Sequence, residues 1–598
     1  MPIHIMKQML QEIRSTFTAS HGILWQVINQ RNRTWKRSAD VIPSKTAKQQ
    51  LRLMTASKQR RSDWNNIEDF FSFTRGRFLR DETRELSQRY VKFNVEELTR
   101  IAAEATGAHH CESVHKFADG MHNKALLLTM DNGTEVVGKI PNPNAGRPHF
   151  TTASEVATMD FMRSVLGTPV PKVLSWSSKM ENPVGTEYII MEKLPGVQLN
   201  KIWNKLDIEV RLKVVKQIAK YQADWTTTSF SQFGSVYYRQ DLPSGETLVY
   251  RSKDDKQIID DRFTIGPSTS RQNTDDGRNG IEFDRGPWKT AEEYEIATGM
   301  REIACIEQFS QLPSSPIALY GPGTYRPSKA KKLEAARGYL KFVKYLLPDD
   351  ESIQTSHIWH NDLHVENIFV NPNDPSEILG FIDWQSTELA PLYDHTIEPY
   401  ILDYDGPRVE GLLERPKLAE IQRQFDSDPA SQEKAERLFV KMSLVSLYRH
   451  LIHLTNPQLF RVLEFHQTTR FQLLLLARNL LVDGEATYLA LLAEQQKNWS
   501  ELPRVRAEGN PECPLEFSVE ELATIKTDSE GAVLGISLMQ DVQNRIGRQF
   551  FQAQGLVDHG QFDEAKKALR RVKKDLVQEY SSNEAEAREW ENAWPFDD

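Results

Sequence analysis

The stretch that decides the fold reads His357-Ile-Trp-His360-Asn361-Asp362-Leu363-His364-Val-Glu-Asn367-Ile368-Phe369-Val370. It is followed by a turn rich in Asn, Pro and Asp (371–376) and by a second apolar run, 378–382, which ends at Asp383-Trp384. Two short apolar runs around such a turn predict a β-hairpin. The hairpin would return Asp383 to the side of Asn367, although 16 positions separate them.

The polar residues of this stretch have the spacing of a phosphoryl-transfer loop. Four residues separate Asp362 from Asn367, as in the pattern H-x-D-x-x-x-x-N, where the Asp accepts the proton of the substrate hydroxyl and the Asn binds a magnesium ion. Asp383 would add a carboxylate oxygen, a hard ligand of the kind that magnesium prefers. The pattern predicts a catalytic base at Asp362 and metal ligands at Asn367 and Asp383.

Two other motifs compete with this interpretation and fail on their residues. Gly133 to Ile140 matches G-x-x-x-x-G-K, but Ile140 stands where a P-loop needs Ser or Thr for magnesium. His360 and His364 have the spacing of zinc ligands, but Asn361 stands where H-E-x-x-H has its catalytic glutamate. We therefore expect neither a P-loop nor a zinc hydrolase.

The composition is that of a folded globular chain. It has 598 residues, 39% of them hydrophobic and 26% charged, which excludes collagen-like and wholly disordered classes. The three cysteines lie far apart, so we expect no disulfide framework and no thiolate zinc site. The net charge of −9 does not indicate a nucleic-acid partner, and the longest apolar run, 471–478, is too short for a transmembrane segment.

The first 62 residues differ from the rest, because they contain twelve Lys and Arg but only two acidic residues. Met6, Met9, Leu10, Ile13 and Phe17 recur at helical spacing beside basic residues, in a stretch rich in Ser and Thr. This combination is typical of a mitochondrial transit peptide. The alternative is a basic arm that stays on a cytoplasmic protein.

Residues 63–195 predict a small lobe rich in strands, after a helical segment. Asn94 as N-cap and Gly107 as terminator bound one helix. Asp131-Asn132-Gly133 predicts the turn of a β-hairpin. The remaining elements that we expect are two hairpin strands (124–130 and 134–140), a helix (152–166) and two further strands (173–176 and 188–191).

The rest of the chain is predicted to be mostly helical. Apolar residues recur at helical spacing over 208–225 and 434–454 in a large lobe, 196–515, which contains the catalytic loop, 357–384. A polar, turn-rich stretch, 241–290, interrupts it and predicts a long ordered insertion or loop. Residues 516–598 form a helical extension, in which an amphipathic helix with Phe562, Ala565, Leu569, Val572 and Leu576 should pack on the body.

His360-Asn-Asp362-Leu-His364-Val-Glu-Asn367 with Ile382-Asp383-Trp384 resembles the Brenner motif, H-x-D-L-H-x-x-N followed by I-D-W, of the aminoglycoside phosphotransferase and choline kinase branch of the protein-kinase-like fold. The resemblance implies an α+β, bilobal protein-kinase-like fold with a small β-rich N-lobe, a large mostly helical C-lobe and a C-terminal helical extension. It also implies ATP and Mg²⁺ in the cleft. Phe70 to Phe78, Arg89 to Asn94 and Arg285 to Trp288 resemble a fungal mitochondrial subgroup, the altered-inheritance-of-mitochondria phosphotransferase-like proteins.

The same resemblance assigns the nucleotide-binding residues. Lys139 would hold the α and β phosphates, and Glu155 would pair with it. Gly120 would lie in the loop that covers the phosphates. Met191 and Glu192 would belong to the strand and hinge whose backbone meets adenine.

The sequence departs from protein kinases in two places. The phosphate-covering loop has the single glycine Gly120 where protein kinases have G-x-G-x-x-G. No long activation segment separates Asp383 from Pro391, which favours a small-molecule acceptor over a protein substrate. The sequence therefore predicts a phosphotransferase that acts on a hydroxyl of a small molecule, and the alternative is a mitochondrial pseudokinase or scaffold that binds nucleotide without turnover.

Overall fold

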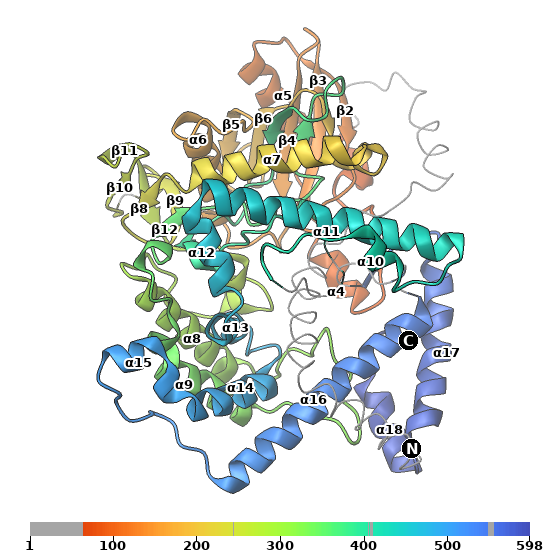
Figure 1. Ribbon diagram of the computed structural model, residues 1–598. Coiled ribbons are helices and arrows are strands. Elements are labelled where there is room, and N and C mark those ends of the chain that lie inside the picture. Colours follow the sequence, from red (N-terminus) through yellow and green to blue (C-terminus); the bar gives the residue numbers. More distant parts are fainter. Residues whose placement is uncertain are drawn as a thin grey trace.

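The computed structural model describes residues 64–242, 244–402, 404, 406, 411–547, 550 and 555–597. The predicted transit peptide, 1–62, lies outside the described residues. The described chain forms a lobe built on one antiparallel sheet, a larger lobe with many helices, and a C-terminal group of helices (Figure 1). The expected bilobal α+β fold is confirmed.

The N-lobe is a five-stranded antiparallel sheet in the order β2-β3-β4-β6-β5. Helix α5 begins where the Asn94 side chain accepts a hydrogen bond from the Glu97 N–H, and it ends at Gly107, which has the positive φ of a terminating glycine. The elements of this lobe are β1 (Arg77–Phe78), α4 (Glu82–Ser87), α5 (Val95–Thr106), β2 (Cys111–Lys116), β3 (Asn123–Met130), β4 (Glu135–Pro141), α6 (Phe150–Ser164), β5 (Val173–Ser177) and β6 (Tyr188–Glu192).

The two faces of this sheet join different cores because side chains alternate along a strand. On β6, Tyr188 and Ile190 belong to a core shared with α5, whereas Ile189 and Met191 belong to the main core of the molecule, shared with α6 and the C-lobe. The alternation places α5 on the outer face of the sheet and the cleft on the inner face.

The C-lobe contains the long helices α7 and α11, which pack against each other across the middle of the molecule (Figure 1). Helix α7 has the predicted bounds, and α11 begins five residues before the predicted 434 because Asp428 caps it and Pro429 occupies its first turn. The helices of this lobe are α7 (Ile208–Trp225), α8 (Ala291–Gln308), α9 (Lys329–Leu346), α10 (Leu418–Gln422), α11 (Pro429–Thr455), α12 (Pro457–Phe465), α13 (Thr469–Ala477), α14 (Glu485–Lys497) and α15 (Pro503–Ala507).

The C-lobe also contains more β-structure than the sequence indicates. A six-stranded sheet has the order β15-β12-β8-β10-β11-β9, and a three-stranded sheet has the order β14-β13-β7. Their strands are β7 (Val197–Gln198), β8 (Ser229–Phe230), β9 (Ser235–Tyr238), β10 (Thr247–Arg251), β11 (Gln257–Gly266), β12 (Ser356–Ile358), β13 (Ile368–Val370), β14 (Ile378–Phe381) and β15 (Leu389–Pro391).

The described residues of the insertion 241–290 are only partly a loop. Strands β10 and β11 form an antiparallel hairpin inside it, and Leu248, Phe263 and Ile265 are buried. The stretch is polar in sequence because the outer half of this hairpin faces solvent, where Asp254, Asp255 and Lys256 form the turn region. Because only one end of the hairpin is buried, the alternation of apolar and polar residues is short. The surrounding Gly, Pro and Asp residues therefore dominate the sequence pattern and predict a loop.

The C-terminal extension comprises α16 (Val519–Ile546), β16 (Leu556–Val557), α17 (Phe562–Tyr580) and α18 (Glu584–Ala593). Phe562, Ala565, Leu569, Val572 and Leu576 of α17 are all buried in a core that also includes Leu79. The expectation that this amphipathic helix packs on the body is therefore confirmed.

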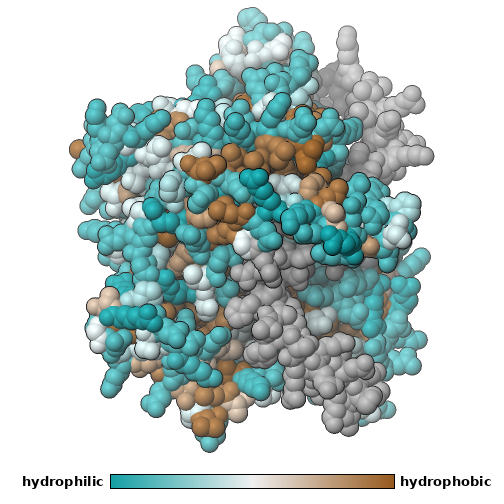
Figure 2. Space-filling model, in the orientation of Figure 1, coloured by the Kyte–Doolittle hydropathy of each residue, from teal (hydrophilic) through white to brown (hydrophobic). Residues whose placement is uncertain are grey.

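The visible surface is mainly hydrophilic, with a hydrophobic band in the upper middle, where Figure 1 shows α7 and α11 (Figure 2). No helix within the described part of the chain is long and apolar enough to cross a membrane.

Candidate active site

The predicted catalytic hairpin is present and brings its polar residues together. Strands β13 and β14 pair antiparallel, with Ile368 opposite Phe381. Beyond them, the Ile382 N–H donates to the Asn367 carbonyl oxygen at 3.0 Å. Asp383 is therefore held beside Asn367, as the sequence predicts.

Lys139 connects the N-lobe to this hairpin. Its Nζ lies 2.6 Å from Glu155 Oε1 and 2.9 Å from Asp383 Oδ1. The three residues come from β4, from α6 and from the end of the hairpin. The Lys139 and Glu155 side chains are 9% and 3% exposed, whereas that of Asp383 is 39% exposed. The open side of the Asp383 carboxylate is thus available to a ligand in the cleft.

The charge of Lys139 is maintained by its partners. Burial by itself lowers the pKa of Lys139, but the carboxylates of Asp383 and Glu155 outweigh burial and raise the pKa above its ordinary value. Lys139 is consequently positively charged at any physiological pH. Its ammonium group is therefore suited to contact phosphate oxygens.

Asp383 has an unusual backbone conformation. Its φ of 65° is in the left-handed region, which Asp enters more readily than most residues but still at a cost of about 1–3 kcal/mol. Strand β14 ends two residues before Asp383, and the left-handed step turns the carboxylate toward Lys139. Strain of this kind persists where surrounding contacts fix the geometry, as at functional sites.

Asp362 and Asn367 lie in one compact loop. Asn367 Nδ2 donates to the Asp362 carbonyl oxygen at 2.9 Å, and its contact with His364 Nε2 is 3.3 Å. These contacts orient the amide nitrogen toward the loop, so its oxygen is the atom suited to ligate a cation. The Asp362 side chain is 40% exposed, with His364 Nε2 3.7 Å from its Oδ2.

Buried aromatic residues and histidines support this loop from below. Trp225 of α7 packs edge to face against Trp359 and Trp384, and His360 Nε2 lies 2.9 Å from the Ile382 carbonyl oxygen. Burial lowers the pKa of His360, and it lowers that of His357 to about 4. Both rings are therefore neutral at pH 7 and belong to the structural support of the loop.

The remaining predicted nucleotide residues occupy the expected elements, but with differing environments. Gly120 lies between β2 and β3, where its N–H donates to the Asn123 carbonyl oxygen at 3.1 Å. A Cβ at Gly120 would have no neighbour closer than 3.4 Å, so no steric requirement for glycine exists there. Met191 is buried at the end of β6, and the Glu192 N–H is already donated to the Lys172 carbonyl oxygen at 2.9 Å.

One contact across the cleft has no sequence signal. Asn123, at the end of the phosphate-covering loop, and Gln385, two residues after Asp383, exchange hydrogen bonds at 2.9 and 3.3 Å through their side-chain amides. They are 262 positions apart, and an isolated Asn or Gln matches no motif. The pair ties the loop above the cleft to the segment that carries the predicted metal ligand.

The donor set fits magnesium. Among the residues that the structure describes, no group of three or more His, Cys, Asp or Glu side chains is placed to hold a metal ion. Asp383 and Asn367 instead offer one carboxylate and one amide oxygen. Magnesium is commonly bound in this way, through one or two protein oxygens together with substrate phosphates and water.

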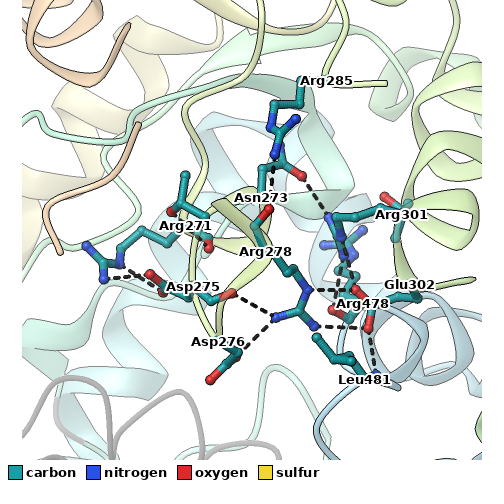
Figure 3. Close-up of polar contacts among 12 residues, drawn as sticks. Arg271, Asn273, Asp275, Asp276, Arg278, Arg285, Arg301, Glu302, Arg478 and Leu481 are labelled. Carbon is teal, nitrogen blue, oxygen red and sulfur yellow. Dashed lines mark hydrogen bonds and ion pairs between the residues drawn. The ribbon is translucent and has the colours of Figure 1, made fainter. Parts of the chain in front are cut away.

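Arg278 of the insertion and Arg301 of α8 belong to a buried polar network (Figure 3). Glu302 of α8 accepts from Arg278 Nε and Nη2 and from Arg301 Nε, each at 3.0 Å, and from the Leu481 N–H at 2.8 Å. Burial opposes ionisation of this carboxyl, but the guanidinium groups of Arg278 and Arg301 lower the pKa of Glu302. These arginines hold the insertion on the helices, and their charges are already balanced inside the protein.

Comparison with known families places this site in a class. A model described as the phosphotransferase enzyme family matches residues 113–397, the segment that holds all the site residues named above. The match covers just under half of the chain, and it confirms the resemblance inferred from the motifs. The site is therefore that of a kinase-like phosphotransferase.

Relatives extend over more of the chain. A subtelomeric hrmA-associated cluster protein of Aspergillus fumigatus is 27% identical over 524 residues, which cover 82% of this chain and 97% of the relative. Altered inheritance of mitochondria protein 9, mitochondrial, of Yarrowia lipolytica is 27% identical over 353 residues, or 54% of this chain and 59% of that protein. Among solved structures, the aminoglycoside phosphotransferase APH(4)-Ia is 13% identical with a TM-score of 0.30, covering 74% of this chain and 99% of that one.

We expect Glu302→Gln to destabilise the fold by about 3–5 kcal/mol, because it leaves buried guanidinium groups without their counter-charge. Glu307→Gln on the same helix is the matched control. Glu307 is half exposed and pairs only at the surface with Arg337, so its loss should cost less than about 1 kcal/mol. Denaturant unfolding measures both, and equal losses would show that the network is not a source of stability.

His357 predicts a specific loss of stability in acid. Its pKa is about 4 in the folded chain and ordinarily 6.5, so the unfolded chain binds more protons between these values and stability falls as the pH falls through this window. Between pH 7.5 and 5 the wild type should lose about 2 kcal/mol more than His357→Gln. Thr355→Val, which removes the 2.8 Å contact with His357 but keeps the ring, should retain the wild-type pH dependence. If the free energy of unfolding depends on pH equally in wild type and His357→Gln, the lowered pKa of His357 is contradicted.

Proposed function

We propose that this protein binds ATP with Mg²⁺ and transfers the γ-phosphoryl group to a hydroxyl of a small-molecule acceptor. The observation that carries the proposal is the double contact of Lys139 with Glu155 and Asp383. A structural lysine needs only one counter-charge. Here a second carboxylate, that of Asp383 in the C-lobe, also contacts the ammonium group and is 39% exposed. This is the arrangement expected where phosphates and a cation are bound.

The roles follow from the positions of the side chains. Lys139 would bind phosphate oxygens, with Glu155 keeping its ammonium in place. Asp383 and the Asn367 amide oxygen would hold magnesium, which when bound neutralises charge on the phosphates. Gly120, Met191 and Glu192 would line the nucleotide site on the N-lobe side.

Asp362 would act as the base. The acceptor oxygen forms a bond to the γ-phosphorus as the bond from that phosphorus to the ADP oxygen breaks, and the hydroxyl proton passes to the Asp362 carboxylate. The partly exposed position of Asp362 leaves it accessible to a small acceptor. Most of the rate enhancement would come from positioning and fixed charge.

Thermal unfolding of the full chain with and without Mg-ATP tests nucleotide binding. A ligand at about 100 times its Kd should stabilise the wild type by about 2.7 kcal/mol. We expect Asp383→Asn to lose the magnesium-dependent part of this stabilisation. Asp374→Asn is the control, because Asp374 lies exposed in the turn of the same hairpin and should respond as wild type does. No response of the wild type would contradict the proposed function.

Turnover is measured on the same proteins as ADP formed from ATP and water, which needs no knowledge of the acceptor. Asp362→Asn should bind Mg-ATP normally and lose ADP formation by about 10² to 10⁴. A wild type that binds Mg-ATP but forms no ADP would favour the pseudokinase alternative.

We also propose that the protein resides in mitochondria. The basic, acid-poor segment 1–62 supports this location, as do relatives whose names carry the word mitochondrial. Residues 1–62 fused to a fluorescent protein should carry it into mitochondria, and the same fusion with Arg14, Arg31 and Arg33 changed to Glu should stay in the cytosol. Cytosolic fluorescence of the first fusion would contradict the proposal.

A further inference from the structure

The C-terminal extension contacts the N-lobe through a segment just before α4. Strand β1 pairs antiparallel with β16, and the Leu79 N–H donates to the Gly555 carbonyl oxygen at 3.0 Å. The two segments approach so closely at Gly76 that a Cβ there would lie 2.4 Å from the Val557 carbonyl oxygen. Only glycine fits this position.

The end of the extension closes on the same segment. The Asp597 N–H donates to the Leu79 carbonyl oxygen at 3.0 Å. Its carboxylate accepts from the N–H groups of Asp81 and Glu82 at 2.9 and 3.1 Å, at the beginning of α4. In Figure 1, α4 lies between the N-lobe sheet and helices α16 to α18. We call residues 73–82 with 555–557 and Asp597 the brace.

The brace reaches the phosphate-covering loop through a buried carboxylate. The Thr74 N–H and Oγ1 both donate to Asp119 Oδ2 at 2.8 Å. The Asp119 side chain is fully buried and also pairs with Lys116 at 2.7 Å and Lys124 at 3.5 Å. Asp119 directly precedes Gly120, so these contacts fix the point at which the loop leaves the sheet.

An apolar contact connects the same two parts. Phe73, Phe78 and Leu556 are buried together in a small cluster, and Met121 packs against it. Met121 follows Gly120 in the loop, whereas Leu556 belongs to β16. The loop is therefore held on both sides of Gly120, by Asp119 before it and by Met121 after it.

We propose that the brace positions the phosphate-covering loop, and that Thr74 and Asp119 are positioning residues for nucleotide phosphates. The inference rests on the proposed function. A loop with a single glycine closes over phosphates with fewer backbone amides free to approach them, and holding it in place beforehand reduces the entropy lost when nucleotide binds. The extension, distant in sequence, thereby becomes part of the nucleotide site.

The test compares Gly76→Ala with Gly280→Ala in the full chain. Gly76→Ala forces β1 away from the Val557 carbonyl, whereas a Cβ at Gly280 meets no atom within 4 Å. Hydrogen exchange of the amides of 117–123 should be about fivefold faster in Gly76→Ala than in wild type or control. The Kd for Mg-ATP should rise about tenfold, while the Kd for adenosine, which lacks phosphates, changes by less than about twofold.

The outcomes separate the two proposals. Unchanged hydrogen exchange of the amides of 117–123 in Gly76→Ala overturns the proposal that the brace positions the loop. An equal loss of affinity for ATP and adenosine overturns it as well. A wild type that binds no nucleotide contradicts the proposed function, while faster exchange in Gly76→Ala would still support the coupling of brace and loop. If Gly76→Ala does not fold, Thr74→Val removes one of the two hydrogen bonds from Thr74 to Asp119 and should shift exchange and ATP affinity in the same direction.

Discussion

The arrangement of the molecule depends on one buried ammonium group. Lys139 carries a charge that is costly to bury, and carboxylates from two separate parts of the chain contact it. Glu155 fixes α6 against the sheet, and Asp383 fixes the C-lobe hairpin against the same lysine. The two lobes therefore meet at one shared positive charge.

The predicted catalytic loop is supported by a hairpin and by packed aromatic rings. The hairpin β13–β14 holds Asp383 beside Asn367, and packed indole rings of Trp225, Trp359 and Trp384 lie beneath it. Buried neutral histidines occupy polar positions in this support without adding charge. The strained backbone of Asp383 is tolerated because these contacts determine where the chain must run.

Two segments, the insertion 241–290 and the C-terminal extension, are each attached to the rest of the molecule with the help of a buried carboxylate. The insertion is attached to α8 through the carboxylate of Glu302 and its arginine partners. The C-terminal extension reaches the N-lobe through the backbone pairing of β1 with β16 and the buried Asp119. In both, a carboxylate inside the protein collects several donors, which fixes a peripheral segment in one position.

The sequence by itself determined the catalytic hairpin, the cap of α5, the turn of the first hairpin and the bounds of α7, because each depends on local turn chemistry or on a short apolar period. The pairing of Lys139 with Glu155 was implied by the family resemblance of the motifs, and the structure contains it. Only the tertiary structure decided that Asp383 joins that pair, that Asn123 bonds to Gln385, that strands lie within the insertion and that residues 555–597 support the phosphate-covering loop. Those contacts join residues up to several hundred positions apart. Single polar residues and short half-buried strands form no periodic pattern of apolar residues, so the sequence does not reveal them.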